Sequence, residues 1–142
     1  MSATMTNKLS TLAAALVLSL AAGTVQAQAM RPEVGKPLQA ASDMLKAGKG
    51  KEALAKVREA EAVGGKTAAE ALMVERMKVA AAQRAGDLGT AAQALESLYG
   101  KASGAEQGQI AEQLASTYAS ARDNAKAAQW VQKAQAAGNN SA

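Results

Sequence analysis

The stretch KAGKGKEALAKVREA, residues 46–60, recurs in outline as RAGDLGTAAQALESL at residues 84–98 and as SARDNAKAAQWVQKA at residues 120–134. Each copy contains a helix-breaking step followed by two packing positions seven residues apart. The breaking positions, Gly48, Gly86 and Arg122, are separated by 38 and then 36 residues. A period of this length is typical of stacked helical hairpins. The recurrence therefore predicts a helical repeat fold rather than a catalytic domain.

The composition of the chain fits one small all-α domain. With 142 residues, no Phe, one Trp and two Tyr, the core has to be built from Ala, Leu, Val and Met on closely approaching helices. No run alternates apolar and polar residues with the β-branched enrichment of a strand, so we expect no sheet. A plain helical bundle and a partly disordered Ala-rich chain are the two alternatives that the same pattern permits.

The absence of Cys and His from the sequence limits the chemistry that the chain can perform. It removes His-dependent triads, Cys nucleophiles and nearly every zinc or copper site. An enzyme would have to use carboxylate, Lys, Ser or Tyr side chains, and no residue stands out for such a role. We therefore expect no catalytic residue, no metal site and no cofactor.

The first 27 residues have the three parts of a secretory signal peptide: Lys8, an apolar run from Leu9 to Ala22, and a stretch of small residues. Val25 and Ala27 suit cleavage before Gln28, and Ala27 and Ala29 would allow cleavage before Met30. The apolar run is shorter than the roughly twenty residues that span a bilayer, so we expect no stable membrane span after cleavage. The expected location is periplasmic or secreted, with 15 basic and 12 acidic residues left in the mature chain.

The rest of the chain divides into six expected helices. A flexible lead-in at residues 28–36 precedes a helical domain at 37–137, and a disordered tail at 138–142 follows it. Pro37 suits the first turn of the first helix, and Gly48 suits the left-handed position that ends it. The three hairpins are expected at about residues 37–66, 67–102 and 103–137.

Capping residues support these helix boundaries. Thr67 with Glu70 forms the pattern of a capping box, T-x-x-E, and Ser103 with Glu106 repeats it. Asp87 and Asp123 are suited to cap the fourth and sixth helices. These four signals predict where four of the six helices begin.

The pattern resembles the tetratricopeptide repeat (TPR) family, a helix-turn-helix unit whose small residues let neighbouring helices approach closely. The third unit matches best, and the first two are degenerate because they lack the large aromatic residue that matches Tyr118. The resemblance covers residues 36–137 and implies three stacked antiparallel hairpins in a short right-handed solenoid. The implied repeat-packing residues are Ala53 and Ala60, Ala91 and Leu98, Leu114 and Tyr118, and Ala127 and Ala134.

The resemblance also implies a function, because family members are usually non-enzymatic adaptors whose successive first helices line a groove that holds a peptide or a partner helix. The groove candidates carried over by register are Lys46, Met73, Arg76, Met77, Gln83, Arg84, Glu112 and Gln113, with Leu38, Ser42, Leu45, Ala80, Gln109 and Ser116 beside them. Arg76 and Arg84 could present a positive strip to an acidic segment, or they are ordinary solvated charges. Met73 and Met77 could offer an adaptable contact surface, or they belong to the core.

Three further patterns are weaker. The last three residues of a phosphate-binding loop motif are matched by Gly65, Lys66 and Thr67. The first glycine of that motif is missing, however, and the preceding segment is helical. Glu59 and Glu61 are two apart on a helix and point away from each other. The basic residues Lys46, Lys49, Lys51, Lys56 and Arg58 are interleaved with acids and have no aromatic neighbours, so we expect no nucleic-acid binding.

Taken together, these features predict an exported adaptor or scaffold that binds a protein or peptide partner in the cell envelope. The competing hypothesis is a structural or chaperone-like envelope-assembly subunit. It would act by forming a homo-oligomer through the apolar face that the last hairpin leaves uncovered.

Overall fold

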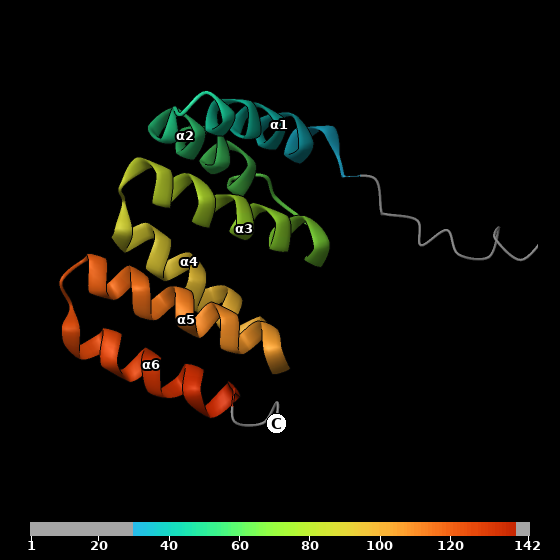
Figure 1. The fold of residues 1–142 in the computed structure, drawn as a ribbon. Helices are drawn as coiled ribbons and strands as arrows, with labels where there is room; N and C mark the ends of the chain where they lie inside the picture. Colours follow the sequence, from blue (N-terminus) through green and yellow to red (C-terminus); the bar gives the residue numbers. More distant parts are fainter. Residues whose placement is uncertain (1–29, 139–142) are drawn as a thin grey trace, which may run out of the picture.

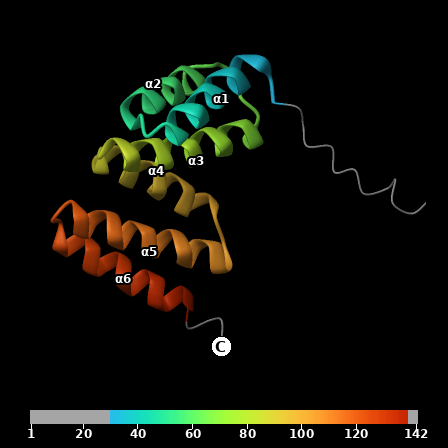
Figure 2. The same cartoon turned by 45° about the horizontal axis from the view of Figure 1, so that its top comes forward.

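The computed structural model describes residues 30–138, and every regular element among them is an α-helix. The helices run along the molecule in chain order, with α1 and α6 at opposite ends (Figures 1 and 2). The expected signal peptide and residues 139–142 lie outside the described residues. The bounds are α1 Pro32–Lys46, α2 Gly50–Glu61, α3 Ala68–Ala85, α4 Leu88–Lys101, α5 Gly104–Ser120 and α6 Asn124–Gly138.

The six helices form three hairpins, α1 with α2, α3 with α4 and α5 with α6, and each hairpin packs against the next. The two junctions between hairpins are not equivalent. At the first junction α3 contacts both helices of the preceding hairpin. At the second junction α5 packs on α4, and across residues 30–138 it makes at most marginal backbone contact with α3.

The same turn closes all three hairpins. Gly48, Gly86 and Arg122 have φ angles of 77°, 74° and 62°. The next amide in each turn donates to a carbonyl five residues earlier: Lys49 to Met44 at 2.8 Å, Asp87 to Ala82 at 2.9 Å and Asp123 to Tyr118 at 2.9 Å. This is the hydrogen-bond pattern of a helix that ends on a left-handed residue. The periodic breaks in the sequence are therefore three copies of one local structure, including the copy that has an arginine in place of glycine.

Small residues bring the helices together, as the sequence predicts. Ala53, Ala60 and Ala91 are fully buried, and Leu98 is almost so. The third pair is less enclosed, because Ala127 is 9% exposed and Ala134 is half-buried. The core is divided: one cluster joins α1 and α2 with Val74, Ala81 and Ala82 of α3 and Ala91 of α4, and a second joins Val79 of α3 with α4, α5 and Trp130 of α6.

Leu114 and Tyr118 of α5 differ in how deeply they are buried. Leu114 is fully buried in the second cluster, and Tyr118 packs at its edge. The Tyr118 hydroxyl donates to the carboxylate of Glu96 on α4. That hydrogen bond raises the pKa of Tyr118 to about 12.

The first junction contains a close approach and an ion pair whose carboxylate, that of Glu70, is buried. Gly50 begins α2 where it crosses the end of α3, and a Cβ atom at this position would overlap the amide nitrogen of Ala85. The carboxylate of Glu70 on α3 accepts hydrogen bonds from the backbone and the guanidinium of Arg31, 3.0 Å away in both cases. Those bonds and the amide of Thr67 hold the pKa of Glu70 at about 2.

Two local predictions are wrong. The first helix begins at Pro32 and not at Pro37, so the expected lead-in is helical from Pro32 onward, and Pro37 lies inside α1. The reason is tertiary: Val34 is fully buried and Arg31 is anchored to Glu70, and these contacts outweigh the single backbone hydrogen bond that Pro37 removes. At the other end, Gly138 belongs to α6 rather than to the tail.

A third local prediction, the capping box at α5, is also wrong. Ser103 precedes the helix but makes no capping hydrogen bond, and the carboxylate of Glu106 pairs with Arg76 instead. The box of Thr67 and Glu70 is confirmed in both directions. Asp87 accepts from the Thr90 amide, and Asp123 accepts from the Lys126 amide, as expected for caps.

Candidate functional site

The loose second junction leaves an apolar cleft between α3 and α5, with α4 as its floor. Two adjoining cavities of about 290 and 230 Å³ make up this α3–α5 cleft, and both are lined by Arg76, Leu98 and Glu106. Its apolar surface comes from Leu72, Val79, Leu95, Leu98 and Ile110, and its polar rim from Arg76, Lys101, Glu106, Gln109 and Gln113. An apolar interior with a few polar groups at the rim is the usual composition of a binding site.

An ion pair crosses the α3–α5 cleft. The guanidinium of Arg76 on α3 lies 2.8 Å from the carboxylate of Glu106 on α5, and both side chains are about half exposed. An ion pair that is so accessible to water is worth at most about 1 kcal/mol. The pair therefore costs little to open, and opening it would expose the apolar floor.

Leu98 accounts for the difference between the two junctions. The corresponding position in the first hairpin is Ala60, which is fully buried at the tight junction with α3. A leucine at this position occupies more volume than an alanine, and its side chain lines both cavities of the cleft. The second hairpin thus has a larger residue than the first at this position, and that residue lines the opening between α3 and α5.

The groove candidates lie at several different places in the structure. Arg76 and Gln113 line the α3–α5 cleft. Met73 lies on the same helix as Arg76, and 43% of it is exposed. Gln83 and Arg84 are exposed in the last turn of α3. Lys46 is exposed at the end of α1, 3.9 Å from Asp43.

Three of the candidates, Leu38, Leu45 and Met77, belong to the core instead. Leu38 is 4% exposed within the first cluster, so the expectation that it lines a groove is wrong. Met77 is half-buried and packs against the same cluster. At the tight first junction α3 lies directly against α1, and these side chains pack into the cluster between the two hairpins.

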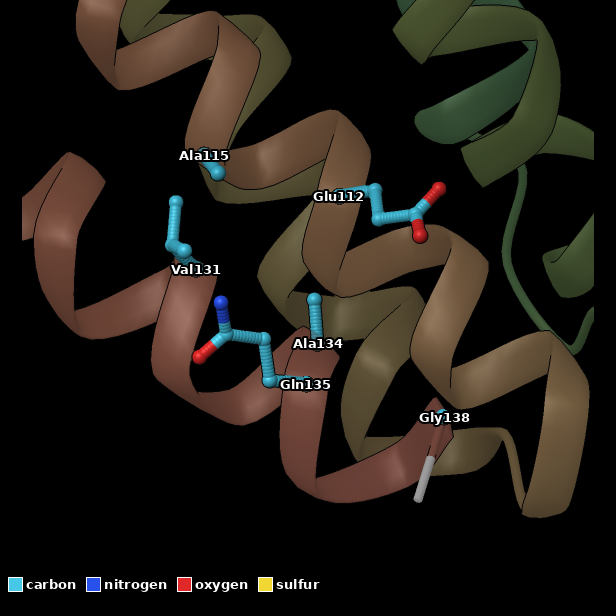
Figure 3. Close-up of a pocket in the computed structure, with 6 residues that line it drawn as sticks. All are labelled: Glu112, Ala115, Val131, Ala134, Gln135 and Gly138. Atoms are coloured by element: carbon cyan, nitrogen blue, oxygen red, sulfur yellow. The ribbon is translucent and has the colours of Figure 1, made fainter. Parts of the chain in front are cut away.

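Glu112 lies at a different surface, the outer face of the last hairpin. A cavity of about 410 Å³ there is lined by α5 and α6 residues: Glu112, Ala115, Val131, Ala134, Gln135 and Gly138. In Figure 3, Val131 and Gln135 of α6 rise beside Ala115 of α5, and the Glu112 carboxylate extends from α5 away from α6. We call this surface the terminal face.

The weaker sequence patterns have structural roles. The ammonium of Lys66 donates to the carbonyls of Glu61 and Val63 at the end of α2, and Thr67 caps α3. The glycine, lysine and threonine that resemble a phosphate loop thus end one helix and begin the next. Glu59 pairs with Lys56, and Glu61 pairs with Lys78, so the two carboxylates act separately.

The residues that the sequence analysis missed are those that make the α3–α5 cleft apolar, together with Glu106. Leu72, Val79 and Ile110 carry the spacing of a helical core and give no signal of an opening beside them. Glu106 was assigned to a local capping box, and its partner Arg76 is 30 residues away. No local pattern reports a pair at that separation.

Comparison with protein-family models, with curated proteins and with solved structures gives no match to this chain. None of the helices between residues 30 and 138 combines the length and apolar character needed to cross a bilayer. Over the same residues, no group of three or more acidic side chains is placed to hold a metal ion.

Proposed function

We propose that this protein is an exported, non-catalytic adaptor or scaffold of the tetratricopeptide-repeat type that binds a protein or peptide partner through the α3–α5 cleft. In this proposal the three hairpins form a short right-handed solenoid. The three identical turns and the buried small residues support the repeat assignment. The apolar run from Leu9 to Ala22 supports export to the periplasm or beyond the cell.

The observation that carries the binding function is the apolar cleft crossed by the Arg76–Glu106 pair. A partner segment that inserts aliphatic side chains between α3 and α5 would bury the apolar surface of those side chains, which contributes about 25 cal/mol for each Å². The same segment could exchange the Arg76–Glu106 pair for its own contact to Arg76. Opening this pair is a small cost relative to that burial.

Photo-cross-linking in the cell envelope tests the proposal. A photoreactive amino acid at Met73, beside the cleft, is expected to capture a partner that mass spectrometry can identify, whereas one at exposed Ala55 on α2 is not. Arg76→Glu should reduce capture several-fold, because it removes the guanidinium that the partner segment would contact and puts the opposite charge in its place. Lys51→Glu, an exposed change of equal charge on α2, should leave capture unchanged.

Equal capture from Met73 and Ala55, or capture that Arg76→Glu leaves intact, would remove the cleft as the binding site. The competing function is a structural or chaperone-like subunit that self-associates. It draws on a different observation, the exposure of Val131 on the terminal face. Light scattering of the purified protein separates the two: the adaptor is a monomer without its partner, and the structural subunit is a stable homo-oligomer.

A further inference from the structure

The terminal face repeats the surface on which the second hairpin receives α5. The turn residues Gly86 and Arg122 set an offset of 36 between the second and third hairpins. Under that offset the cleft residues Arg76, Val79, Leu95, Leu98 and Ala102 correspond to Glu112, Ala115, Val131, Ala134 and Gly138. All five counterparts line the cavity of the terminal face. One surface therefore occurs twice, once with a helix against it and once without.

The uncovered copy exposes the residue that the covered copy buries. Leu95 is 1% exposed beneath α5, and its counterpart Val131 is 43% exposed. In the first hairpin the same position is Val57, which is fully buried. In the first two hairpins, this position is covered by the first helix of the following hairpin, α3 or α5. On the terminal face the same position is open to one further helix.

The charge of Glu112 indicates which kind of residue a helix bound to the terminal face would carry. Arg76 pairs with Glu106, which lies one turn before Ile110 on the helix that covers it. Glu112 takes the place of Arg76 on the terminal face, and it makes no ion pair with any residue between 30 and 138. The charge at this position is thus positive in the α3–α5 cleft and negative on the terminal face. The complementary helix therefore places a basic residue where α5 places Glu106.

A second copy of the chain fits this surface poorly. The residues that line the terminal face include one acid and no base, so two such faces brought together supply no cation for Glu112. The opposite end of the stack, the outer face of α1, is polar, with Glu33, Lys36, Gln39 and Asp43 exposed. A polar outer helix is what closes a repeat array against further stacking.

We propose that the terminal face binds one amphipathic helix of a partner protein. That helix carries Lys or Arg at one position and aliphatic residues four and eight positions later, matching Glu106, Ile110 and Leu114 of α5. The aliphatic residues cover Val131 and Ala134, and the basic residue pairs with Glu112. This site is separate from the α3–α5 cleft and does not depend on it.

A charge swap with a defined peptide tests the proposal. The probe is a fluorescently labelled peptide of residues 103–120 carrying Glu106→Lys, and its control is the same peptide with Glu106 retained. We expect saturable binding to the purified protein by fluorescence anisotropy, with the lysine peptide about twofold to fivefold tighter, the range of one exposed ion pair. Glu112→Lys in the protein should reverse the preference. Glu52→Lys, an exposed charge change on α2, should preserve it.

A second variant tests the apolar contact. Val131→Asp places a charge where the peptide would bury aliphatic side chains, and we expect a loss of affinity of about tenfold or more. Because Val131 is exposed in the free protein, the variant should fold, and circular dichroism checks this. Arg76→Glu alters the α3–α5 cleft and should leave peptide affinity unchanged, which separates this site from the proposed function.

Three outcomes overturn the proposal: no saturable binding, the same peptide preference before and after Glu112→Lys, or full affinity in Val131→Asp. A fourth is a wild-type dimer that Val131→Asp converts to a monomer, since a second copy would then occupy the terminal face.

Discussion

Gly50 shows how a single residue sets the distance between two hairpins. Its α-carbon lies where the start of α2 meets the backbone of Arg84 and Ala85 at the end of α3, and no room remains for a side chain. Backbone atoms in two packed helices move only together, so an added methyl group cannot be accommodated by one side chain rotating away. The tight first junction depends on the absence of a Cβ atom at this position.

Gly50→Ala is therefore expected to destabilise the protein by about 1 to 3 kcal/mol, the usual cost of overpacking. Gly100→Ala is the matched control, because Gly100 lies in α4 and a methyl group added to its α-carbon would meet no other atom within 4 Å. An alanine there should stabilise the helix by up to about 1 kcal/mol. Urea unfolding measures both. Equal effects of the two substitutions would contradict the close approach at Gly50.

Glu70 makes the stability of the first junction depend on pH. Its pKa is about 2 in the folded protein against an ordinary value of 4.5, because Arg31 and the amide of Thr67 stabilise the carboxylate. A lowered pKa contributes stability that is fully present above the unfolded value and is lost as the pH falls through the folded value. The contribution of Glu70 therefore disappears between about pH 5 and pH 2.

Glu70→Gln should lower the urea midpoint at pH 7, and its deficit relative to the wild type should shrink as the pH approaches 2. Glu52→Gln, at an exposed site on α2, should follow the wild type at every pH. A Glu70→Gln deficit that stays constant from pH 7 to pH 2 would mean that the ion pair with Arg31 does not carry the effect.

At the scale of an element, the two capping boxes show that one sequence pattern can have two outcomes. Thr67 and Glu70 cap each other at the start of α3. At α5 the serine makes no capping bond, and the glutamate reaches across to Arg76. A long-range partner competes with the local one for the same carboxylate, so the pattern predicts that a helix begins there but not how its first amides are satisfied.

The two boxes should respond differently to the same change. Thr67→Ala removes a hydrogen bond to the Glu70 amide and is expected to cost about 1 kcal/mol. Ser103→Ala removes no capping bond and should change the free energy of unfolding by less than about 0.5 kcal/mol. Thermal or urea denaturation of the two single variants provides the comparison. A larger loss from Ser103→Ala than from Thr67→Ala would contradict the hydrogen bonding described.

At the scale of the whole molecule, stability is distributed unevenly along the stack. Five residues of α2 and five of α4 are buried, against only Ala127 and Trp130 in α6. Tyr99 packs edge-on against Trp130, with ring centroids 4.9 Å apart, and this contact ties α6 to α4. Because helices in such an array are stabilised mainly by their neighbours, the last helix has one side without support.

Native-state hydrogen exchange should therefore show lower protection in α6 than in α2 or α4, since local opening of α6 exposes less apolar surface. Binding of a helix to the terminal face should raise that protection. Uniform protection across α2, α4 and α6 would indicate that the protein unfolds as a single cooperative unit.

The helical class, the three turns and most helix ends are predictable from the sequence, because these features depend on residues within five positions of one another. Gly48, Gly86, Asp87 and the box at Thr67 act through bonds to their own neighbours. The candidate site was only partly predictable. Arg76 and Gln113 are among the groove candidates that line the cleft, but the sequence predicts neither the apolar floor beneath them nor the pairing of Arg76 with Glu106.

The early start of α1, the burial of Leu38, the opening between α3 and α5 and the placement of Glu112 on the terminal face follow from tertiary packing instead. The first three depend on how residues of two hairpins meet, as Gly50 meets the backbone of Ala85. Repeats that look alike in sequence can therefore pack tightly at one junction and leave a cleft at the next, because the packing free energy depends on both partners and a local pattern contains only one.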